Sequence, residues 1–249
     1  MKPLDQADEL RGYYKDKDVV AKYMRKRTTQ PLNGFLHRRQ VAFLNRAVIA
    51  RQLGRVLEIA CGPGRLTAEI ENVEQGVAVD FSPSMLQEAR RRTNDAGHWA
   101  FLRSDAFVLP FRSASFDGAY TLRFVRHFHL EDRRRLYAEI GRVLRPGGVF
   151  MLDALNRDVS LPHRAQRGLG SYQIYDVLYD RRELEGELEE AGFRVVAIEG
   201  ILKRFGLQRP LNRLRRVRLG GLARVMIAAL EMLPGDQPET WMVLCERKG

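Results

Sequence analysis

Short apolar segments alternate with segments of helical periodicity between residues 55 and 153, and this alternation constrains the fold more than any other feature. The apolar runs predict strands at 56–60, 77–80, 99–102, 115–121 and 149–153, and the spacing of apolar residues predicts helices at 66–74, 84–93 and 131–144. Strands and helices that alternate at this length form a parallel sheet with helices on both faces.

The flanking regions follow a different pattern. Residues 5–53 have helical spacing, 156–180 predict loop and short helix, 181–191 a helix, and 200–233 a long, basic and partly helical segment. Two further strands are predicted at 193–198 and 239–246. The predicted fold class is α/β: a doubly wound, mostly parallel seven-stranded sheet with helices on both faces and an antiparallel last strand.

Composition narrows the class of protein. The apolar share of 45% is ample for a buried core. No apolar run reaches the roughly 18 residues of a membrane span, and residues 1–5 lack the apolar start of a secretory signal. Cys61 and Cys245 are far apart, and neither has other metal-ligand residues at a typical spacing, so no metal is expected. Two cysteines in the chain favour a cytoplasmic protein with reduced thiols. The net charge of +11 favours anionic partners or reflects an arginine-rich proteome.

A glycine-containing turn follows the first predicted strand, in the run Glu58-Ile59-Ala60-Cys61-Gly62-Pro63-Gly64. Glycine lets the backbone bend sharply and approach a ligand with no side chain in the way. Ligands of doubly wound sheets bind at this carboxyl end of the strands. The second strand ends eighteen residues after Gly62 at Asp80, whose carboxylate suits the two hydroxyls of a ribose.

A dinucleotide-binding fold uses similar parts, but three residues argue against it. Thr67 stands where the third glycine of the dinucleotide fingerprint belongs. Glu58 lies inside the strand, where a carboxylate is unsuited to a pyrophosphate and suited to a cationic amino group. Asp105 follows the third strand and is placed to reach an adenine amino group.

Five motifs occur in order along the chain. They are the acidic glycine loop at 58–64, the ribose segment at 80–86, Asp105-Ala106 followed by 109–111, Phe116-Asp117, and Leu-Arg-Pro-Gly-Gly at 144–148. In order and spacing they resemble the class I (Rossmann-like) S-adenosylmethionine-dependent methyltransferases, particularly the small-molecule group that includes quinone and sterol methylating enzymes. Ala60 replaces the first glycine of that family's loop. The resemblance covers residues 55–153 closely.

The resemblance implies that S-adenosylmethionine is the cofactor. Glu58 would then lie near its methionine amino group, Asp80 on its ribose, and Phe81 and Met85 against its adenine. Leu122 would pass its backbone beside the methionine part, and the segment of Tyr23 and Arg27 would close over the carboxylate. The expected cofactor-binding residues are Arg27, Glu58, Ala60, Cys61, Gly62, Gly64, Asp80, Phe81, Ser82, Met85, Ser104, Asp105, Ala106 and Leu122.

Candidate residues for the transfer follow the fourth strand. His127 falls where many relatives have a histidine that faces the cofactor cleft, and it is either a general base or a packed histidine. Arg123 and Arg126 are candidates to hold an anionic acceptor, unless they are solvated helix arginines. Asn156, after the fifth strand, is expected on the acceptor side. His129 is expected at the mouth of the site or on the surface.

Residues 200–230 contain eight cations and no aspartate or glutamate. Such a segment binds anionic lipid, grips RNA phosphates, or flanks an acceptor pocket with a solvated face. An anionic membrane or amphiphilic acceptor is favoured over nucleic acid, because Phe205 is the one aromatic residue there for base stacking. The predicted location is therefore the cytoplasm, with peripheral contact to a membrane left open.

These observations give one functional hypothesis and two alternatives. Residues 1–249 are expected to form one methyltransferase domain, with a helical lid (1–53), a cofactor-binding core (55–153), and an acceptor-side segment with closing strands (154–249). The hypothesis is direct in-line methyl transfer from S-adenosylmethionine to a small-molecule or lipid-like acceptor. The alternatives are an RNA methyltransferase that uses the basic segment, and a non-catalytic S-adenosylmethionine-binding assembly protein.

Overall fold

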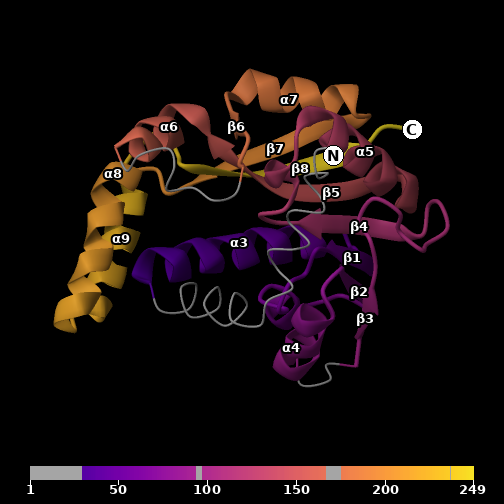
Figure 1. Ribbon diagram of the computed structural model, residues 1–249, viewed down its shortest axis with the longest axis horizontal. Coiled ribbons are helices and arrows are strands. Elements are labelled where there is room, and N and C mark those ends of the chain that lie inside the picture. Colours follow the sequence, from indigo (N-terminus) through magenta and orange to yellow (C-terminus); the bar gives the residue numbers. More distant parts are fainter. Residues whose placement is uncertain (1–29, 94–96, 167–174, 236) are drawn as a thin grey trace, which may run out of the picture.

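A mixed β-sheet crosses the molecule in a computed structural model that describes residues 30–93, 97–166, 175–235 and 237–249. The sheet is eight-stranded within these residues and has the order β3-β2-β1-β4-β5-β8-β7, with β6 paired to β5 (Figure 1). The strands are β1 Arg55–Ile59, β2 Gln75–Asp80, β3 Trp99–Arg103, β4 Phe116–Thr121, β5 Leu144–Asn156, β6 Leu178–Tyr179, β7 Phe193–Ile201 and β8 Thr240–Arg247.

Strand direction follows the predicted pattern. β1 is parallel to β2 and β4, and the parallel pairing continues to β3 on one side and β5 on the other. β8 is antiparallel to both β5 and β7. The predicted sheet with an antiparallel last strand is therefore confirmed, and the two-residue strand β6 is an addition that the sequence pattern did not indicate.

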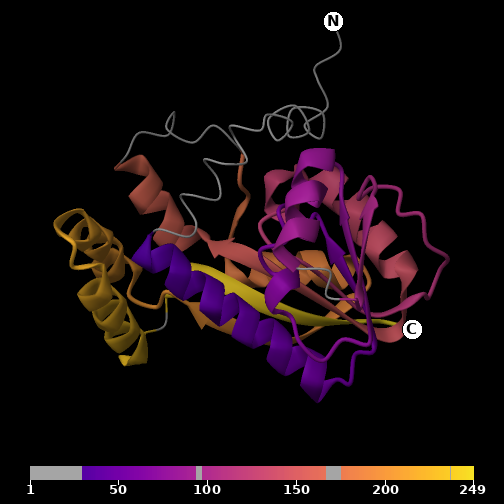
Figure 2. The same cartoon turned by 90° about the horizontal axis from the view of Figure 1, so that it is seen from below.

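Helices cover both faces of the sheet, as predicted (Figures 1 and 2). One face packs against α3 (Pro31–Ala50) and α4 (Pro83–Thr93), and the other against α5 (Leu130–Val143) and α7 (Arg181–Glu190). The apolar residues divide into two buried clusters in the same way. Leu44 of α3 belongs to one cluster and Leu136 of α5 to the other, and both side chains are inaccessible to solvent.

Two local predictions were wrong. The helix expected at 66–74 is only a turn of 3₁₀ helix at Thr67–Glu69, because Ile70 adopts an extended conformation that leads the chain into β2. The strand expected at 149–153 begins earlier, because β5 starts at Leu144, which pairs with Phe116 before the register shifts at a bulge. Gly147 still bends the backbone there with φ +72°.

The N-terminal helical segment is described only in part. Residues 1–29 lie outside the described part of the chain. The remainder, α3, buries Leu32, Phe35 and Phe43 against the sheet. Residues 31–50 thus form a core helix.

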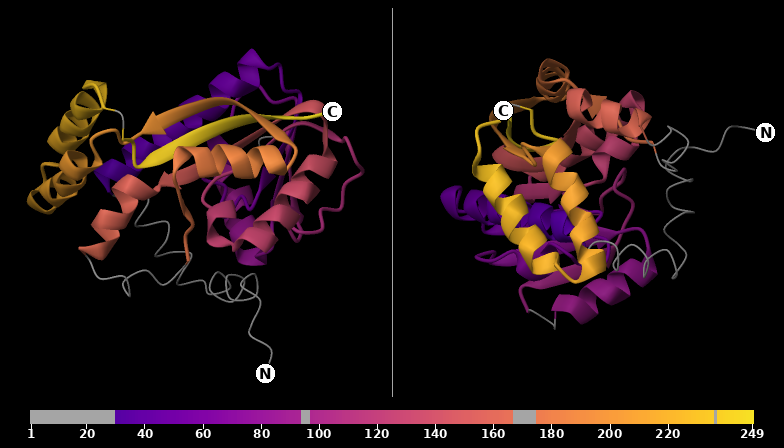
Figure 3. Two further views of the ribbon diagram at one scale, coloured as in Figure 1. Left: turned by 90° about the horizontal axis from the view of Figure 1, so that it is seen from above. Right: turned by 90° about the vertical axis from the view of Figure 1, so that its left-hand side faces the viewer.

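A helical insertion separates β7 from β8. It consists of α8 (Phe205–Gln208), the 3₁₀ helix η4 (Arg209–Val217) and α9 (Gly220–Met232), and it forms the left-hand end of the molecule in Figure 1. Figure 3 (right) shows its two long segments side by side. α6 (Arg157–Ala165) lies close to it, since the His163 and Phe205 rings are 4.9 Å apart. None of the helices that the structure describes has the length and apolarity needed to span a bilayer.

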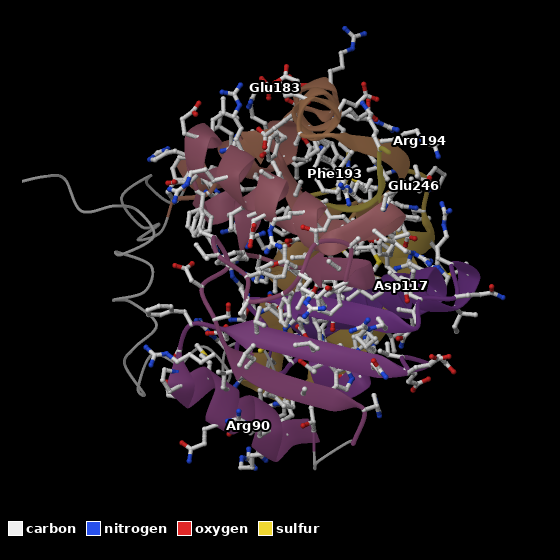
Figure 4. The ribbon with its side chains drawn as sticks, turned by 90° about the vertical axis from the view of Figure 1, so that its right-hand side faces the viewer. Arg90, Asp117, Glu183, Phe193, Arg194 and Glu246 are labelled. Carbon is white, nitrogen blue, oxygen red and sulfur yellow. The ribbon has the colours of Figure 1, made fainter. Side chains whose placement is uncertain are left out.

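The edge of the sheet at the amino ends of the parallel strands is closed by ion pairs and hydrogen bonds. Asp117 accepts a hydrogen bond from the Arg55 backbone N–H at 2.8 Å and pairs with Arg145 at 3.2 Å. Arg194 of β7 pairs with Glu246 of β8, and Figure 4 shows these side chains on the same side of the molecule as Asp117. Any ligand cleft is left to the opposite edge, at the carboxyl ends of the strands.

Candidate cofactor and acceptor site

A cleft opens at the carboxyl ends of β1, β2 and β4. Its walls come from the turns after β1 and β2, from the segment after β3 and from the segment after β4. The lining residues are Glu58, Ala60, Cys61, Gly62, Pro63, Arg65, Leu66, Val79, Asp80, Phe81, Ser82, Met85, Ser104, Asp105, Ala106, Phe107, Leu122, Arg123, Phe124, His127 and Phe128. The three acids predicted from three separate motifs therefore meet at one site.

Three residues of the turn after β1 adopt positive φ angles: Ala60 (+55°), Gly62 (+56°) and Gly64 (+68°). The two glycines are needed for different reasons. A Cβ added at Gly62 would meet nothing within 4 Å in the described chain, so the backbone there borders open space in the cleft. A Cβ added at Gly64 would lie 2.8 Å from the Cα of Ala89, so Gly64 permits close contact with α4. Gly64 shapes the turn and does not line the cleft.

Asp80 ties the end of β2 to this turn. Its carboxylate accepts hydrogen bonds from the backbone N–H groups of Gly62 at 2.8 Å and Ser82 at 2.9 Å. Burial raises the pKa of Asp80, and these backbone donors lower it in part. A carboxylate with remaining lone pairs at the cleft wall suits a ligand that presents hydroxyl donors, as a ribose does.

Glu58 is a buried acid on β1. Its Oε2 accepts hydrogen bonds from the hydroxyl of Thr67 and from Tyr120 Oη at 2.9 Å. Burial raises the pKa of Glu58 to about 7, although both hydrogen bonds act to lower it. An ammonium group in the cleft would stabilise the ionised carboxylate. Thr67 thus uses its hydroxyl at the position where a dinucleotide-binding turn would have glycine.

The predicted adenine side forms the opposite wall. Ser104 and Asp105 extend from β3, and the Ser104 N–H donates to the Asp80 carbonyl at 3.1 Å. Asp105 Oδ1 accepts from the Phe107 N–H at 3.0 Å and thereby fixes the bend after β3. Phe81 and Met85 line the cleft from the segment after β2. All the residues expected near an adenine are therefore brought together.

Some cleft residues were not predicted. Arg65 lies one residue after the turn, and its guanidinium donates to Gln40 Oε1 at 3.2 Å and contacts His37. It is a cation at the cleft wall, able to face a carboxylate. Tyr120 donates to Glu58 without lining the cleft itself, and it is opposite Glu58 in the β1–β4 register, so strand alignment was the available signal for it. Arg27 and Tyr23, the predicted carboxylate partners, lie outside the described residues.

Two residues predicted to bind the acceptor make structural contacts outside the cleft. Arg126 is buried and forms ion pairs with Asp153 at 3.3 Å and with Asp176 at 3.1 Å, and it does not line the cleft. Asn156 caps α6, since its Oδ1 accepts from the Asp158 N–H at 3.0 Å. It is buried and likewise absent from the cleft wall. Arg123 does line the cleft, in a backbone conformation with φ +64°.

His127 lies at the cleft wall with one ring nitrogen held from behind. Its Nδ1 is 2.9 Å from the Tyr175 carbonyl and 3.0 Å from Asp176 Oδ1. Burial alone would raise the pKa of Asp176, but Arg126, His127 and Arg164 together lower it below its usual range. Asp176 is therefore an anion that orients the ring. The sequence carried no signal for it, because it lies in a segment without periodic pattern.

Aromatic rings line the cleft beside His127. Phe124 and Phe107 each meet Phe128 edge to face, at centroid distances of 5.0 and 5.3 Å. Phe107 and Phe124 are half-buried and Phe128 is fully buried. This wall suits an apolar or aromatic molecule next to the histidine.

Other chemistry finds less support in the described chain. Among the described residues no group of three or more His, Cys, Asp or Glu side chains could hold a metal ion. Cys61 and Cys245 are buried and free, and burial raises the pKa of both thiols. Thiolate chemistry is thereby disfavoured at Cys61, although this residue lines the cleft.

The fold and the cleft define a class of protein. A parallel sheet with one antiparallel strand carries, at its carboxyl edge, a glycine turn, a ribose-side acid and an adenine-side acid. Glu58 places a carboxylate where a pyrophosphate would be repelled and an ammonium group would be attracted. The class is a Rossmann-like domain that binds a nucleoside joined to a cationic amino acid, which is the chemistry of S-adenosylmethionine.

Comparison with known proteins agrees with this class. Residues 56–148 match the family model described as a methyltransferase domain. The chain is 30% identical to the O-methyltransferase cnsE of Penicillium expansum over 67% of the chain and 61% of that protein. It is 30% identical to the O-methyltransferase rstn1 of Aspergillus nomiae over 61% of the chain and 70% of that protein.

A solved structure shows the same fold. Magnesium protoporphyrin IX methyltransferase from Synechocystis PCC 6803, with bound S-adenosylhomocysteine, aligns with a TM-score of 0.67 and 13% identity over 97% of the chain and 100% of that protein. The chain belongs to the class I S-adenosylmethionine-dependent methyltransferases, and its cofactor is S-adenosylmethionine. It spans about 60% of the length of relatives such as cnsE.

Proposed function

We propose that this chain transfers a methyl group from S-adenosylmethionine to an oxygen atom of an apolar small molecule, with His127 as the general base. The observation that carries the proposal is His127 at the cleft wall with Nδ1 held by Asp176 and the Tyr175 carbonyl. With Nδ1 as the donor, Nε2 keeps a lone pair and is the ring atom available to a proton.

Two acids and two arginines lie behind the His127 ring. Asp153 and Asp176 contribute two negative charges, and Arg126 and Arg164 contribute two positive charges through pairs of 2.6–3.3 Å. These ion pairs fix Asp176 beside Nδ1 of the ring. A proton that moves from the acceptor hydroxyl to Nε2 would be stabilised by Asp176 on the other side of the ring.

The remaining residues of the site hold and orient. The cofactor supplies the methyl group on a sulfonium. Glu58 would face its ammonium, Asp80 its ribose hydroxyls, and Arg65 its carboxylate. The apolar wall of Phe107 and Phe124 would exclude water and align an acceptor hydroxyl with the methyl carbon, where positioning supplies much of the acceleration.

The choice of oxygen rests on chemistry and on the relatives. An alcohol or phenol must lose a proton to become a methyl ether, and a base is useful for that step. The curated relatives cnsE and rstn1 bear the name O-methyltransferase. Both observations support a small-molecule hydroxyl acceptor over RNA.

The test uses methyl-labelled S-adenosylmethionine with fractionated cell extract and a panel of phenols and enols. Label is expected in the small-molecule or lipid fraction. His127→Gln should lower kcat on the accepted substrate by roughly 10²–10⁴-fold and leave S-adenosylhomocysteine affinity unchanged. Asp176→Asn should lower kcat in the same direction, since it removes the anion that orients the ring.

His129→Gln is the matched control, because His129 is exposed two residues away. It should retain the wild-type rate. Equal rates for His127→Gln and wild type would refute a base at His127. Label recovered in RNA would replace the small-molecule acceptor with the nucleic acid alternative.

A further inference from the structure

The insertion between β7 and β8 carries exposed apolar side chains on an acid-free surface. We define the docking hairpin as residues 203–233, which include α8, η4 and α9 (Figures 1 and 3). We propose that this hairpin docks the protein on an anionic phospholipid membrane. The proposal concerns binding only and does not depend on the methyl-transfer chemistry.

Exposed aliphatic residues concentrate in the docking hairpin. More than half of the large hydrophobic side chains that are exposed in the described chain lie there. They are Leu207, Val217, Leu219, Leu222, Val225, Met226, Met232 and Leu233, with exposed fractions of 39–87%. A surface of this kind on a single element marks an interaction site.

α9 is apolar on two faces. Its inward face buries Ala223 and Ile227, both inaccessible to solvent. Its outward face presents Leu222, Val225 and Met226, which the three-to-four residue period of a helix places together. The inward face is enough to pack α9 onto the rest of the chain. The outward face is therefore an additional apolar surface that packing does not require.

The tip between η4 and α9 is apolar and flanked by arginines. Val217 and Leu219 are 63% and 47% exposed. Arg218 between them has a left-handed backbone conformation with φ +62°, which turns the chain at the end of η4. An apolar tip of this size can enter the boundary between headgroups and acyl chains while neighbouring guanidinium groups stay at the phosphates.

The cations of the hairpin are available to lipid phosphates. Five exposed arginines of the docking hairpin form no ion pair within the described residues: Arg213, Arg215, Arg216, Arg218 and Arg224. In contrast, Arg133, Arg157 and Arg194 elsewhere in the chain are each paired with a carboxylate.

The one acid in the sequence of the docking hairpin, Glu231, is buried. Glu231 accepts hydrogen bonds from the Leu202 and Lys203 N–H groups at 3.0 and 3.1 Å and from Gln208 Nε2 at 2.8 Å. It therefore serves the interior of the hairpin and does not neutralise the arginines outside. Unpaired surface cations next to exposed aliphatics match an anionic bilayer in both charge and polarity.

Two other partners fit less well. A symmetric contact between two copies would bring two arginine-rich surfaces without exposed acids together, which like-charge repulsion opposes. An RNA platform needs accessible aromatic rings, and Phe205 is half-buried with its ring against His163.

The position of the docking hairpin indicates which side of the molecule would face the membrane. It follows the carboxyl end of β7, and the cleft lies at the carboxyl ends of β1, β2 and β4, which share that edge of the sheet. A membrane bound at the hairpin would lie on the cleft's side of the molecule.

The experiment is vesicle co-sedimentation of the whole chain, with phosphatidylcholine vesicles alone or with about a third phosphatidylglycerol. Wild type should bind the anionic vesicles and should release as salt rises. A charge variant with Arg213, Arg215, Arg216 and Arg218 all changed to Gln should bind at least about tenfold more weakly. A tip variant with Val217, Leu219 and Leu222 changed to Ser should also lose binding.

The matched control removes equal charge elsewhere, by changing Arg112, Arg134, Arg181 and Arg182 to Gln, and should bind vesicles nearly as well as wild type. S-adenosylhomocysteine binding verifies that each variant is folded. The proposal is overturned if wild type ignores anionic vesicles, if the charge variant binds like wild type, or if the control loses as much. Salt-dependent binding to RNA without vesicle binding, or a dimer that the tip variant dissociates, would also overturn it.

Discussion

Glu58 shows how one residue can link cofactor binding to pH. Burial raises its pKa to about 7, so much of the free protein carries the neutral acid near neutrality. A ligand ammonium favours the ionised form, and binding must therefore release a proton below pH 7. Affinity rises with pH for this reason and levels off once Glu58 is ionised in the free protein.

We expect S-adenosylhomocysteine to bind about tenfold more weakly at pH 6 than at pH 8, because a carboxyl of pKa about 7 is ionised in only a tenth of molecules at pH 6. Glu58→Gln should bind weakly and with little pH dependence over this range. Calorimetry in two buffers of different ionisation enthalpy measures both affinity and proton release.

Glu131→Gln is the control for this measurement, because Glu131 is an exposed acid whose side chain is 80% accessible. It should retain the wild-type pH profile. A flat wild-type profile would contradict the placement of Glu58 beside the ammonium.

At the scale of elements, α5 and α7 are joined by a buried ion pair. Arg133 Nε lies 2.8 Å from Glu187 Oε1, and the same carboxylate accepts from Tyr137 Oη at 3.1 Å and Tyr179 Oη at 2.8 Å. Arg133 is 5% exposed. Removal of one member of such a pair leaves an uncompensated charge in the interior, which costs more than the pair contributes.

Glu187→Gln should therefore lower the free energy of unfolding by about 3 kcal/mol. Glu190→Gln on the same helix removes an acid that is 73% exposed and 3.7 Å from Arg134, and it should change stability by less than about 0.5 kcal/mol. Urea unfolding of both variants makes the comparison. Equal effects of the two substitutions on stability would show that the Arg133–Glu187 pair contributes no more than an exposed one.

The elements also show what the sequence could predict. Apolar periodicity located the main strands and helices because burial of one face requires that spacing, and strand ends located Glu58, Asp80 and Asp105 because parallel strands end at one edge. Asp176 and Glu187 were not predicted as partners of His127 and Arg133. Each contact joins residues about fifty positions apart, and neither leaves a periodic trace in the sequence. The expected helix at 66–74 did not form because Thr67 turns its hydroxyl to Glu58 and Ile70 adopts an extended conformation ahead of β2.

The two edges of the sheet differ in the side chains they carry. The amino edge holds structural pairs such as Arg194–Glu246, whereas the carboxyl edge holds the cleft and leads into the docking hairpin. The cleft is assembled from residues 58–128, all before β5. The cleft and the docking hairpin are thus different segments that one sheet edge brings together.

The position of the cleft predicts how much a bound ligand raises the free energy of unfolding of the whole chain. S-adenosylhomocysteine would contact the turns after β1, β2 and β3, and at about 100 times its Kd it should add roughly 2.7 kcal/mol to the free energy of unfolding. For a chain of this size, that corresponds to a rise in Tm of roughly 5–10 °C in a thermal unfolding scan. NAD at equal concentration should give no rise, since Glu58 opposes a pyrophosphate.

Two variants distinguish the cleft from the docking hairpin. Asp80→Asn should weaken S-adenosylhomocysteine binding by roughly 2–3 kcal/mol, because charge-assisted hydrogen bonds to the ribose and the tie to the Gly62 and Ser82 backbone are both weakened, and at the same ligand concentration the rise in Tm should nearly vanish. The variant with Arg213, Arg215, Arg216 and Arg218 changed to Gln should keep the full rise, because none of these residues lines the cleft. A rise with NAD, or loss of the S-adenosylhomocysteine effect in the arginine variant, would show that cofactor site and docking hairpin are not the separate parts described.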